Sequence, residues 1–130
     1  MFDRPAYAGY LDGCLEEAVT TYNHEDLAAI FKPATDAQTY NEMPLIYQQD
    51  KQGVYGIIDR VIKSERDITI IDYKSHQLNK NETTQKVASQ FAMQLDYYRN
   101  GVSKLWPGLA VKTGILFTHH KEIVWLEEKF

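Results

Sequence analysis

The chain of 130 residues has little cysteine and no long apolar run. Its single cysteine, Cys14, allows no internal disulfide and cannot supply the several thiolates of an iron–sulfur cluster. No segment approaches the roughly 18 consecutive apolar residues of a membrane span, and the N-terminus lacks the basic-then-apolar pattern of a signal peptide. We therefore expect a cytoplasmic protein with no membrane partner.

The sequence also lacks an excess of positive charge. It has 14 Lys and Arg residues against 18 Asp and Glu residues, a formal net charge of −4. Phosphate contacts from Lys and Arg supply most nonspecific DNA affinity, so a protein that captures nucleic acid unaided is usually basic.

The hydrophobic content of 44% and the nine tyrosines are those of a folded domain, and this length supports one domain.

Two apolar, β-branched runs carry charged residues where apolar residues should continue. Residues 54–62 are typical of a strand with Asp59 in its middle. Residues 68–75 are typical of a second strand, with Asp72 and Lys74 near its end. Because only five residues separate the two runs, we expect a β-hairpin.

The register of this hairpin brings two carboxylates together. A turn centred on residues 65–66 makes the numbers of opposed residues sum to a constant, so Val61 meets Ile70. The same register sets Asp59 against Asp72. Directly opposed Cβ atoms lie roughly 4.5–5.5 Å apart, where two like charges are destabilising unless they are compensated.

A divalent cation would provide that compensation. Lys74 lies two residues after Asp72 and hence on the same face, but one ammonium cannot neutralise two partly buried carboxylates. Hard oxygen ligands suit Mg²⁺ or Mn²⁺, which are the cofactors we expect. The alternative is that the aspartates are solvated or salt-bridged strand residues, with Asp59 paired to Arg60 or Lys74.

Apolar residues on both faces of the hairpin favour burial of the pair, as in an α/β sheet covered on two sides. The faces that we expect are Ile57, Val61, Ile68 and Ile70 on one side and Ile58, Ile62, Ile71 and Tyr73 on the other.

Four motifs follow one another along the chain. They are Glu42, Gly56-x-x-Asp59-Arg60, Asp72-Tyr73-Lys74 and Gln94-x-x-x-Tyr98. A D-x-K triplet alone occurs often by chance, but the ordered set, each part on the expected element, is far more specific. Over roughly positions 40–127 the chain resembles the PD-(D/E)XK nuclease domain of the RecB and AddA helicase-nucleases, the UvrD/Rep-type helicase-associated exonucleases.

The resemblance implies a metal-dependent DNA nuclease. In that family two aspartates and the carbonyl after the second bind the metal, roles that fall here on Asp59, Asp72 and Tyr73. The family lysine works on the attacking water, a role that falls on Lys74. Phosphodiester hydrolysis needs a hydroxide near neutral pH and charge neutralisation at the phosphate, both of which a divalent ion supplies.

Three further residues have two interpretations. Glu42 either takes a catalytic part, at a second metal or a metal-bound water, or is a strand-edge carboxylate. Gln94 and Tyr98 are four residues apart and share a helix face, which the resemblance implies borders the active site and holds substrate. Without the resemblance, Tyr98 is typical of a core and Gln94 of a solvated surface.

One part of the family pattern is missing. RecB-like nucleases carry a histidine near the metal, on a helix upstream of the Glu strand. The first predicted helix, residues 8–22, contains no histidine, and His24 follows it in a loop. Either that helix precedes Met1 in a longer chain or the ligand is absent. We expect residues 1–130 to form a single nuclease domain, a C-terminal fragment of a larger helicase-nuclease.

The other histidines are not expected to bind metal. His76 is predicted to be a surface residue at a strand end. His119 and His120 are adjacent at the end of another strand and are predicted to point to opposite faces.

The expected partners are DNA and the helicase motor domains of the same chain or of a second protein in the same complex. A nuclease domain that is tethered to a helicase motor receives its DNA strand from that motor. It therefore needs positive charge only around the site of cleavage. The cations that could provide it are Lys74, Lys80, Lys86, Arg99 and Lys104.

The expected fold class is α/β, a restriction-endonuclease-like core with a mixed sheet flanked by helices. Pro44 indicates an edge or an irregular start for the first strand. The predicted elements are helices at 8–22 and 25–31, a helix or loop at 34–39, a strand at 42–48, the hairpin, one helix from 79–84 to about 105, and strands at 111–118 and 122–126.

Two functions stay open. One is an exonuclease module acting in DNA repair or recombination. The other is a noncatalytic, nuclease-like module for DNA binding or subunit docking, which the acidic charge and the missing histidine favour. The intact set of Asp59, Asp72 and Lys74 favours the nuclease.

Overall fold

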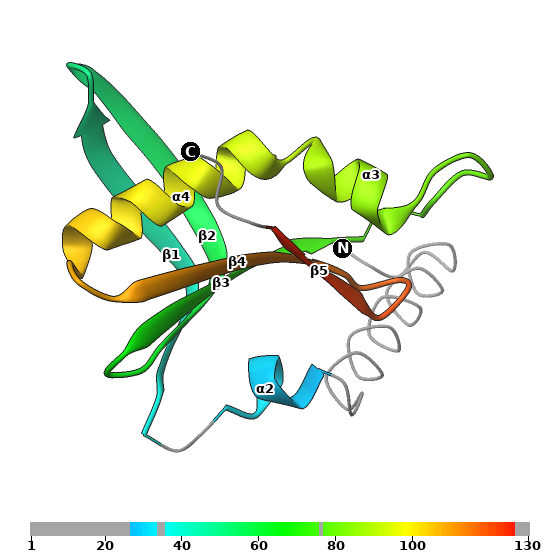
Figure 1. Ribbon diagram of the computed structural model, residues 1–130, viewed down its shortest axis with the longest axis horizontal. Coiled ribbons are helices and arrows are strands. Elements are labelled where there is room, and N and C mark those ends of the chain that lie inside the picture. The colour runs from blue at the N-terminus through cyan, green and yellow to red at the C-terminus, as the bar shows by residue number, and fades with distance from the viewer. Residues whose placement is uncertain (1–26, 34–35, 76, 127–130) are drawn as a thin grey trace, which may run out of the picture.

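A five-stranded mixed sheet forms the centre of the molecule (Figure 1). The computed structural model describes residues 27–33, 36–75 and 77–126. The strand order is β1-β2-β3-β4-β5, with β3 and β4 parallel and the other neighbours antiparallel. The expected α/β fold with a mixed sheet is confirmed. The elements are α2 (Ala28–Phe31), β1 (Gln38–Gln49), β2 (Gln52–Lys63), β3 (Asp67–Lys74), α3 (Thr84–Ser89), α4 (Ala92–Leu105), β4 (Ala110–Phe117) and β5 (Glu122–Leu126).

Helices α3 and α4 connect the parallel strands β3 and β4 and cover one face of the sheet (Figure 1). Parallel neighbours need such a crossover because the chain must return to the same end of the sheet. The larger apolar core lies beneath these helices. Its fully buried members include Ile58, Val61, Ile68, Ile70, Leu95, Val102, Ile115 and Phe117.

A smaller core covers the opposite face. Leu27 and Ile30, at and next to α2, pack against Ile62, Ile71 and Leu116 of the sheet. The sheet is therefore covered on both sides, as the apolar pattern predicts. The helix predicted at 8–22 and His24 lie outside the described residues. Within the described part, no helix is long and apolar enough to cross a membrane.

The predicted alternation of faces fails at one level of the hairpin. Ile58 and Val61 belong to the same core although they are three residues apart, and Ile57 is 47% exposed. On β1, Glu42 has a φ of 50° and is skipped between the pairs Asn41↔Arg60 and Met43↔Ile58. Both strands switch faces at this level, where Glu42 has a left-handed conformation, and the predicted faces of Ile57 and Ile58 were wrong.

The long helix predicted up to residue 105 was also wrong in one respect, because the chain breaks into α3 and α4. Thr83 begins α3 as its cap, accepting the Lys86 N–H at 3.1 Å. At its end the Gln90 and Phe91 amides donate to carbonyls three residues back rather than four. These tighter bonds end the α-helical ladder, and Phe91 starts α4 from a non-helical conformation.

Strand β1 is an edge strand, as Pro44 predicts, and it begins at Gln38, earlier than expected. The β1–β2 hairpin extends past the other strands alongside α4 (Figure 1). Leu45 meets Gly101 of α4, where an added Cβ would lie only 2.4 Å from the leucine. The hairpin is thus held against α4, the helix that carries Gln94 and Tyr98.

Candidate metal and nuclease site

The two aspartates meet where strands β2 and β3 separate. The observed pairs Val61↔Ile70 and Arg60↔Ile71 have the predicted register, and the ladder ends there, one step before Asp59 and Asp72. Asp59 Oδ2 instead accepts the Tyr73 backbone N–H at 2.8 Å. A carboxylate therefore replaces the strand carbonyl that the ladder would have supplied.

Asp72 is the buried member of the pair, with 5% of its surface exposed. The ammonium of Lys74 lies 2.9 Å from its Oδ2. This is the distance of a charge-assisted ion pair, and no other group of the described residues donates to Oδ2. Burial raises the pKa of Asp72 to about 6; Lys74 opposes the rise and the neighbouring Asp59 carboxylate adds to it.

This donor set fits a divalent cation. A buried carboxylate is costly, and a second carboxylate beside it raises the cost beyond what the single ammonium of Lys74 offsets. A hard cation would satisfy both oxygens and favour the ionised form of Asp72. The described residues contain no group of three or more His, Cys, Asp or Glu side chains arranged for a metal, so within this part of the chain further ligands would come from the backbone or water.

The backbone of Tyr73 is placed to contribute. In an extended strand the N–H and C=O of one residue point to the same side. Because the Tyr73 N–H reaches Asp59 on β2, its carbonyl also faces the β2 side. The next carbonyl, that of Lys74, points the other way and accepts the Thr118 N–H at 2.9 Å. Tyr73 is thus the residue whose carbonyl lies on the side of the aspartates.

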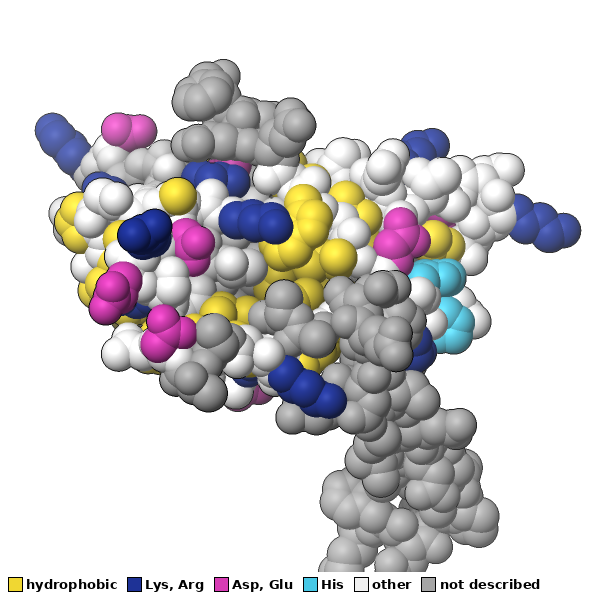
Figure 2. All heavy atoms as spheres, turned by 60° about the horizontal axis from the view of Figure 1, so that its bottom comes forward, with side chains coloured by type: hydrophobic (Ala, Val, Ile, Leu, Met, Phe, Trp, Pro, Cys, Tyr) yellow, Lys and Arg dark blue, Asp and Glu magenta, His cyan; other side chains and the backbone are white. Residues whose placement is uncertain are grey.

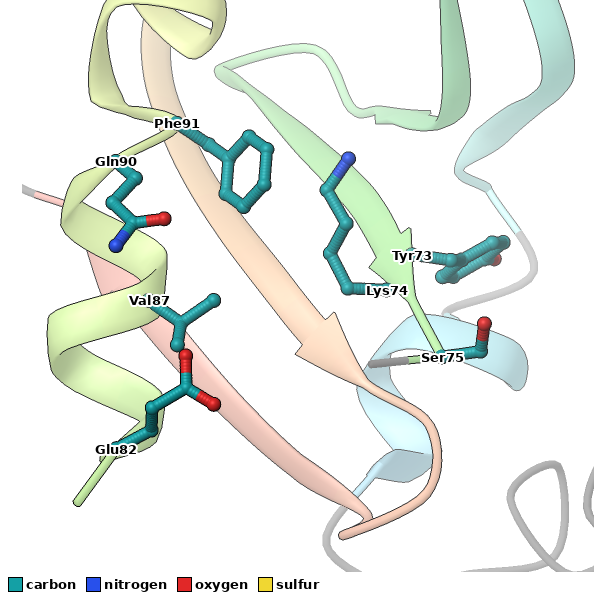
Figure 3. A pocket seen from close by; sticks show the side chains of 7 residues that line it. All are labelled: Tyr73, Lys74, Ser75, Glu82, Val87, Gln90 and Phe91. Carbon is teal, nitrogen blue, oxygen red and sulfur yellow. The ribbon is translucent and has the colours of Figure 1, made fainter. Parts of the chain in front are cut away.

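Lys74 projects from the end of β3 toward the break between α3 and α4 (Figure 3). Its Nζ lies 4.2 Å from the centre of the Phe91 ring. Both residues line a cavity of about 420 Å³ next to the aspartates. The lining residues are Tyr73, Lys74, Ser75, Glu82, Val87, Gln90 and Phe91.

Gln94 and Tyr98 lie on the helix face next to the carboxylates. Gln94 Nε2 donates to the Tyr98 hydroxyl at 3.0 Å, and that hydroxyl donates to the Ile57 carbonyl at 3.1 Å. Burial, and then the negative charge of Asp72, raises the pKa of Tyr98. Tyr98 is therefore both a core residue and a neighbour of the aspartate pair, which combines the two interpretations of the sequence.

Gly56 explains why the first motif begins with glycine. A Cβ at this position would lie 2.8 Å from Cε1 of Tyr98. The Gly-x-x-Asp-Arg and Gln-x-x-x-Tyr motifs are therefore packed against each other, and the glycine lets the tyrosine ring approach the strand.

Arg60 of the same motif points away from the aspartates, toward α2. Its Nε donates to the Ile30 carbonyl at 3.0 Å and its Nη1 to Asn41 Oδ1 at 2.8 Å. Its guanidinium lies 5.9 Å from the Phe31 ring, which stacks on Tyr73 at 6.1 Å. Arg60 thus supports Tyr73 through Phe31, on the face of the sheet that α2 covers. The sequence carries no signal for this arrangement.

Glu42 is exposed and stands opposite Asp59 in the register of β1 and β2. The structure does not bring it into a metal-ligand cluster with the aspartates among the residues it describes. Its catalytic role stays a prediction.

Two predictions about outlying residues were wrong. His119 and His120 follow the end of β4 in a turn, and their rings meet edge to face at 5.1 Å rather than pointing to opposite faces. Arg99 is not a surface cation. It is buried, and donates to the Val111 carbonyl and to Thr113 Oγ1. Lys80, Lys86 and Lys104 are exposed, as predicted, and His76 lies outside the described residues.

The charges on the face seen in Figure 2 are mixed in sign. Lys and Arg side chains alternate with Asp and Glu side chains, and the described residues of this face form no broad basic patch. This agrees with the net charge of −4.

Comparison with known proteins agrees with the motifs. The model of the PD-(D/E)XK nuclease superfamily matches residues 3–124. Three proteins named as subunits of an ATP-dependent helicase/nuclease are similar: those of Clostridium acetobutylicum (30% identical over 80 residues), Oenococcus oeni (28% over 106) and Anoxybacillus flavithermus (26% over 102).

The matches cover 62%, 78% and 70% of this chain, but only 6%, 8% and 8% of those relatives. The chain therefore corresponds to a small part of proteins of that kind. PD-(D/E)XK nucleases generally use divalent metal ions, which agrees with the donor set formed by Asp59 and Asp72. Because the superfamily match extends over nearly the whole chain, the chain belongs to the PD-(D/E)XK nuclease superfamily.

Proposed function

We propose that this chain is a Mg²⁺- or Mn²⁺-dependent deoxyribonuclease domain that hydrolyses phosphodiester bonds. The observation that carries the proposal is the buried carboxylate of Asp72, which lies beside the Asp59 carboxylate and has the single ammonium of Lys74 2.9 Å from its Oδ2. A pair of this kind is costly to a fold that does not use it. A metal site for phosphoryl chemistry explains why it is present.

Asp59, Asp72 and the Tyr73 carbonyl would hold the metal. When bound, the ion supplies an acidified water and charge neutralisation at the phosphate. The Tyr73 N–H fixes one oxygen of Asp59, so this carboxylate is oriented before any ligand arrives. Such preorganisation lowers the reorganisation that a reaction at this site requires.

Lys74 would orient the attacking water and stabilise negative charge that develops on the phosphate. Its ammonium is already next to Asp72, where the reacting groups would meet. Gln94 and Tyr98 would contact the substrate strand from α4, and Glu42 would act from the edge strand on a metal-bound water.

Delivery of the strand by a helicase would explain the acidic charge. The chain resembles a small part of proteins named helicase/nuclease subunits, and its 14 basic residues are outnumbered by 18 acidic ones. We infer that it acts as the exonuclease module of a larger helicase-nuclease in DNA repair or recombination, with motor domains that supply the substrate. The noncatalytic alternative is an outcome of the following test.

The test is a cleavage assay on linear single-stranded and duplex DNA with Mg²⁺, Mn²⁺ or a chelator. Wild type is compared with Asp72→Asn, Lys74→Ala and a matched control, Asp50→Asn, which removes an exposed carboxylate in the β1–β2 turn. We expect metal-dependent cleavage in wild type and the control and a loss of at least about 100-fold in the other two. DNA binding without cleavage in all four proteins would favour the noncatalytic module, and full activity of Lys74→Ala would remove the lysine from the mechanism.

A further inference from the structure

The ammonium of Lys74 has two attractive neighbours, Asp72 and the ring of Phe91. We propose that Phe91 is a positioning residue: its ring holds the Lys74 ammonium in the cavity when Asp72 is engaged by the metal. This inference rests on the proposed nuclease function, and it assigns a role to an aromatic residue that the motifs do not include.

The geometry is that of a cation–π contact. The Nζ atom lies 4.2 Å from the ring centre, within the roughly 6 Å over which the negative face of an aromatic ring attracts a cation. The Lys74 side chain is 25% exposed, so part of the contact is removed from water. Figure 3 shows the lysine side chain rising from β3 with the ring of Phe91 beside its outer half.

The break between the helices places this ring. Phe91 lies between α3 and α4, and its amide donates to the Ala88 carbonyl at 3.0 Å. Its own carbonyl accepts the Leu95 N–H at 3.1 Å, so its backbone is fixed on both sides. The ring packs against the larger core, which restricts its rotation. The helix break therefore has a consequence at the site, because it aims a rigid ring at Lys74.

A neutral ring solves an electrostatic problem of this site. A cation bound to Asp72 would share the oxygen that now attracts Lys74 and would repel the ammonium. Another carboxylate could hold the lysine but would compete for the metal. An aromatic face attracts the ammonium without being a ligand for hard cations, so it can retain Lys74 in the loaded site.

The test separates ring electrostatics from packing. We compare wild type with Phe91→Tyr, Phe91→Leu and a protein carrying pentafluorophenylalanine at position 91, which keeps the ring size but removes its negative face. Met93→Leu is the control, since Met93 lies two residues away and is 70% exposed. We expect kcat to fall roughly tenfold for the leucine and fluorinated proteins, with KM changed less than about twofold, and to stay near wild type for Phe91→Tyr and Met93→Leu.

A second readout needs no activity. The ring current of Phe91 should shift the NMR signals of the Lys74 ε-methylene protons upfield in the metal-free protein and, on our proposal, also with Mg²⁺ present. The shift should persist in Phe91→Tyr and vanish in Phe91→Leu. If wild type fails to cleave DNA but keeps the shift with Mg²⁺, the contact stands and the nuclease function fails.

Three results would overturn the proposal. One is loss of the shift on adding Mg²⁺ to wild type. Another is equal kcat in the leucine and wild-type proteins. The third is normal kcat in the fluorinated protein, which would leave Phe91 a packing residue.

Discussion

At the scale of single residues, the two aspartates have different environments although they are adjacent. Asp59 accepts a backbone N–H, whereas Asp72 is buried and has the Lys74 ammonium 2.9 Å from its Oδ2. The difference follows from the end of the β2–β3 ladder, which leaves the Tyr73 amide free to bind the first carboxylate. Each aspartate therefore has its own predicted effect on stability.

The stability of the metal-free protein should depend on the protonation of Asp72. Its pKa is about 6 in the folded protein and near 3.8 ordinarily, so the folded state binds more protons between these values. The free energy of unfolding from this group therefore rises as pH falls from about 7 to 4, by at most about 3 kcal/mol.

Urea denaturation of wild type and Asp72→Asn across this pH range, in chelator, measures the effect. The difference between the two proteins should change with pH in the direction given and should shrink with Mg²⁺ present. A difference that is constant with pH would show that Asp72 titrates normally.

Substitutions of Asp59 should separate charge from hydrogen bonding. The sequence alone predicts that Asp59→Ala stabilises the metal-free protein by relieving repulsion, but the alanine would also leave the Tyr73 N–H without its acceptor. Asp59→Asn keeps an oxygen for that N–H and removes the charge. We expect the asparagine variant to be more stable than wild type by up to about 1 kcal/mol, and the alanine variant to be less stable than the asparagine variant by about 1–2 kcal/mol.

Thermal or urea unfolding in chelator tests this order, and metal titration should show weakened binding in both variants. Equal stability of the two variants would indicate that the Tyr73 N–H finds another acceptor.

At the scale of elements, the site is an assembly of strand ends and one helix face. Gly56 of β2 admits the ring of Tyr98, whose hydroxyl bonds to the Ile57 carbonyl. Glu42, at the same level on β1, marks the point where both strands switch faces. The elements therefore meet through close contacts whose loss should affect folding and activity together.

Gly56→Ala tests the contact between the strand and the helix. The new methyl group would lie 2.8 Å from the Tyr98 ring, so the ring must move. We expect a loss of about 1–3 kcal/mol of stability and reduced cleavage. Gly53→Ala is the matched control on the same strand, because nothing lies within 4 Å of its added Cβ. Denaturant midpoints measure the difference, and equal midpoints would contradict the packing argument.

At the scale of the whole molecule, net charge limits the affinity that we expect for DNA, the proposed substrate. The net charge is −4, and Arg99, one of the few expected phosphate contacts, is buried against β4. With Arg99 removed from that set, the exposed lysines that remain in it are Lys80, Lys86 and Lys104. The isolated chain should therefore hold DNA weakly.

Binding of single-stranded DNA should depend only slightly on salt. For two or three phosphate contacts, the slope of log K against log[salt] is about −2. Fluorescence anisotropy of a labelled strand with the Asp72→Asn protein, which does not cut in our proposal, gives this slope. A slope steeper than about −5 would reveal an extended basic track and remove the need for delivery by a helicase.

The local sequence pattern was enough to predict how β2 pairs with β3 and to identify the motifs. The spacing of the two apolar runs predicts the register that pairs Val61 with Ile70, because a short turn leaves few ways to pair two strands. The aspartates and Lys74 are adjacent for the same reason. The family motifs likewise depend only on residue types and order.

Tertiary packing decided the rest. The face switch near Asp59, the break at Phe91 and the burial of Arg99 each depend on residues far apart in sequence that compete for the same space. Periodicity describes one element at a time, so it predicted regular alternation and a continuous helix. The contact of Phe91 with Lys74 forms because folding brings the break between the helices next to the end of β3. The sequence pattern of either element alone does not predict this contact.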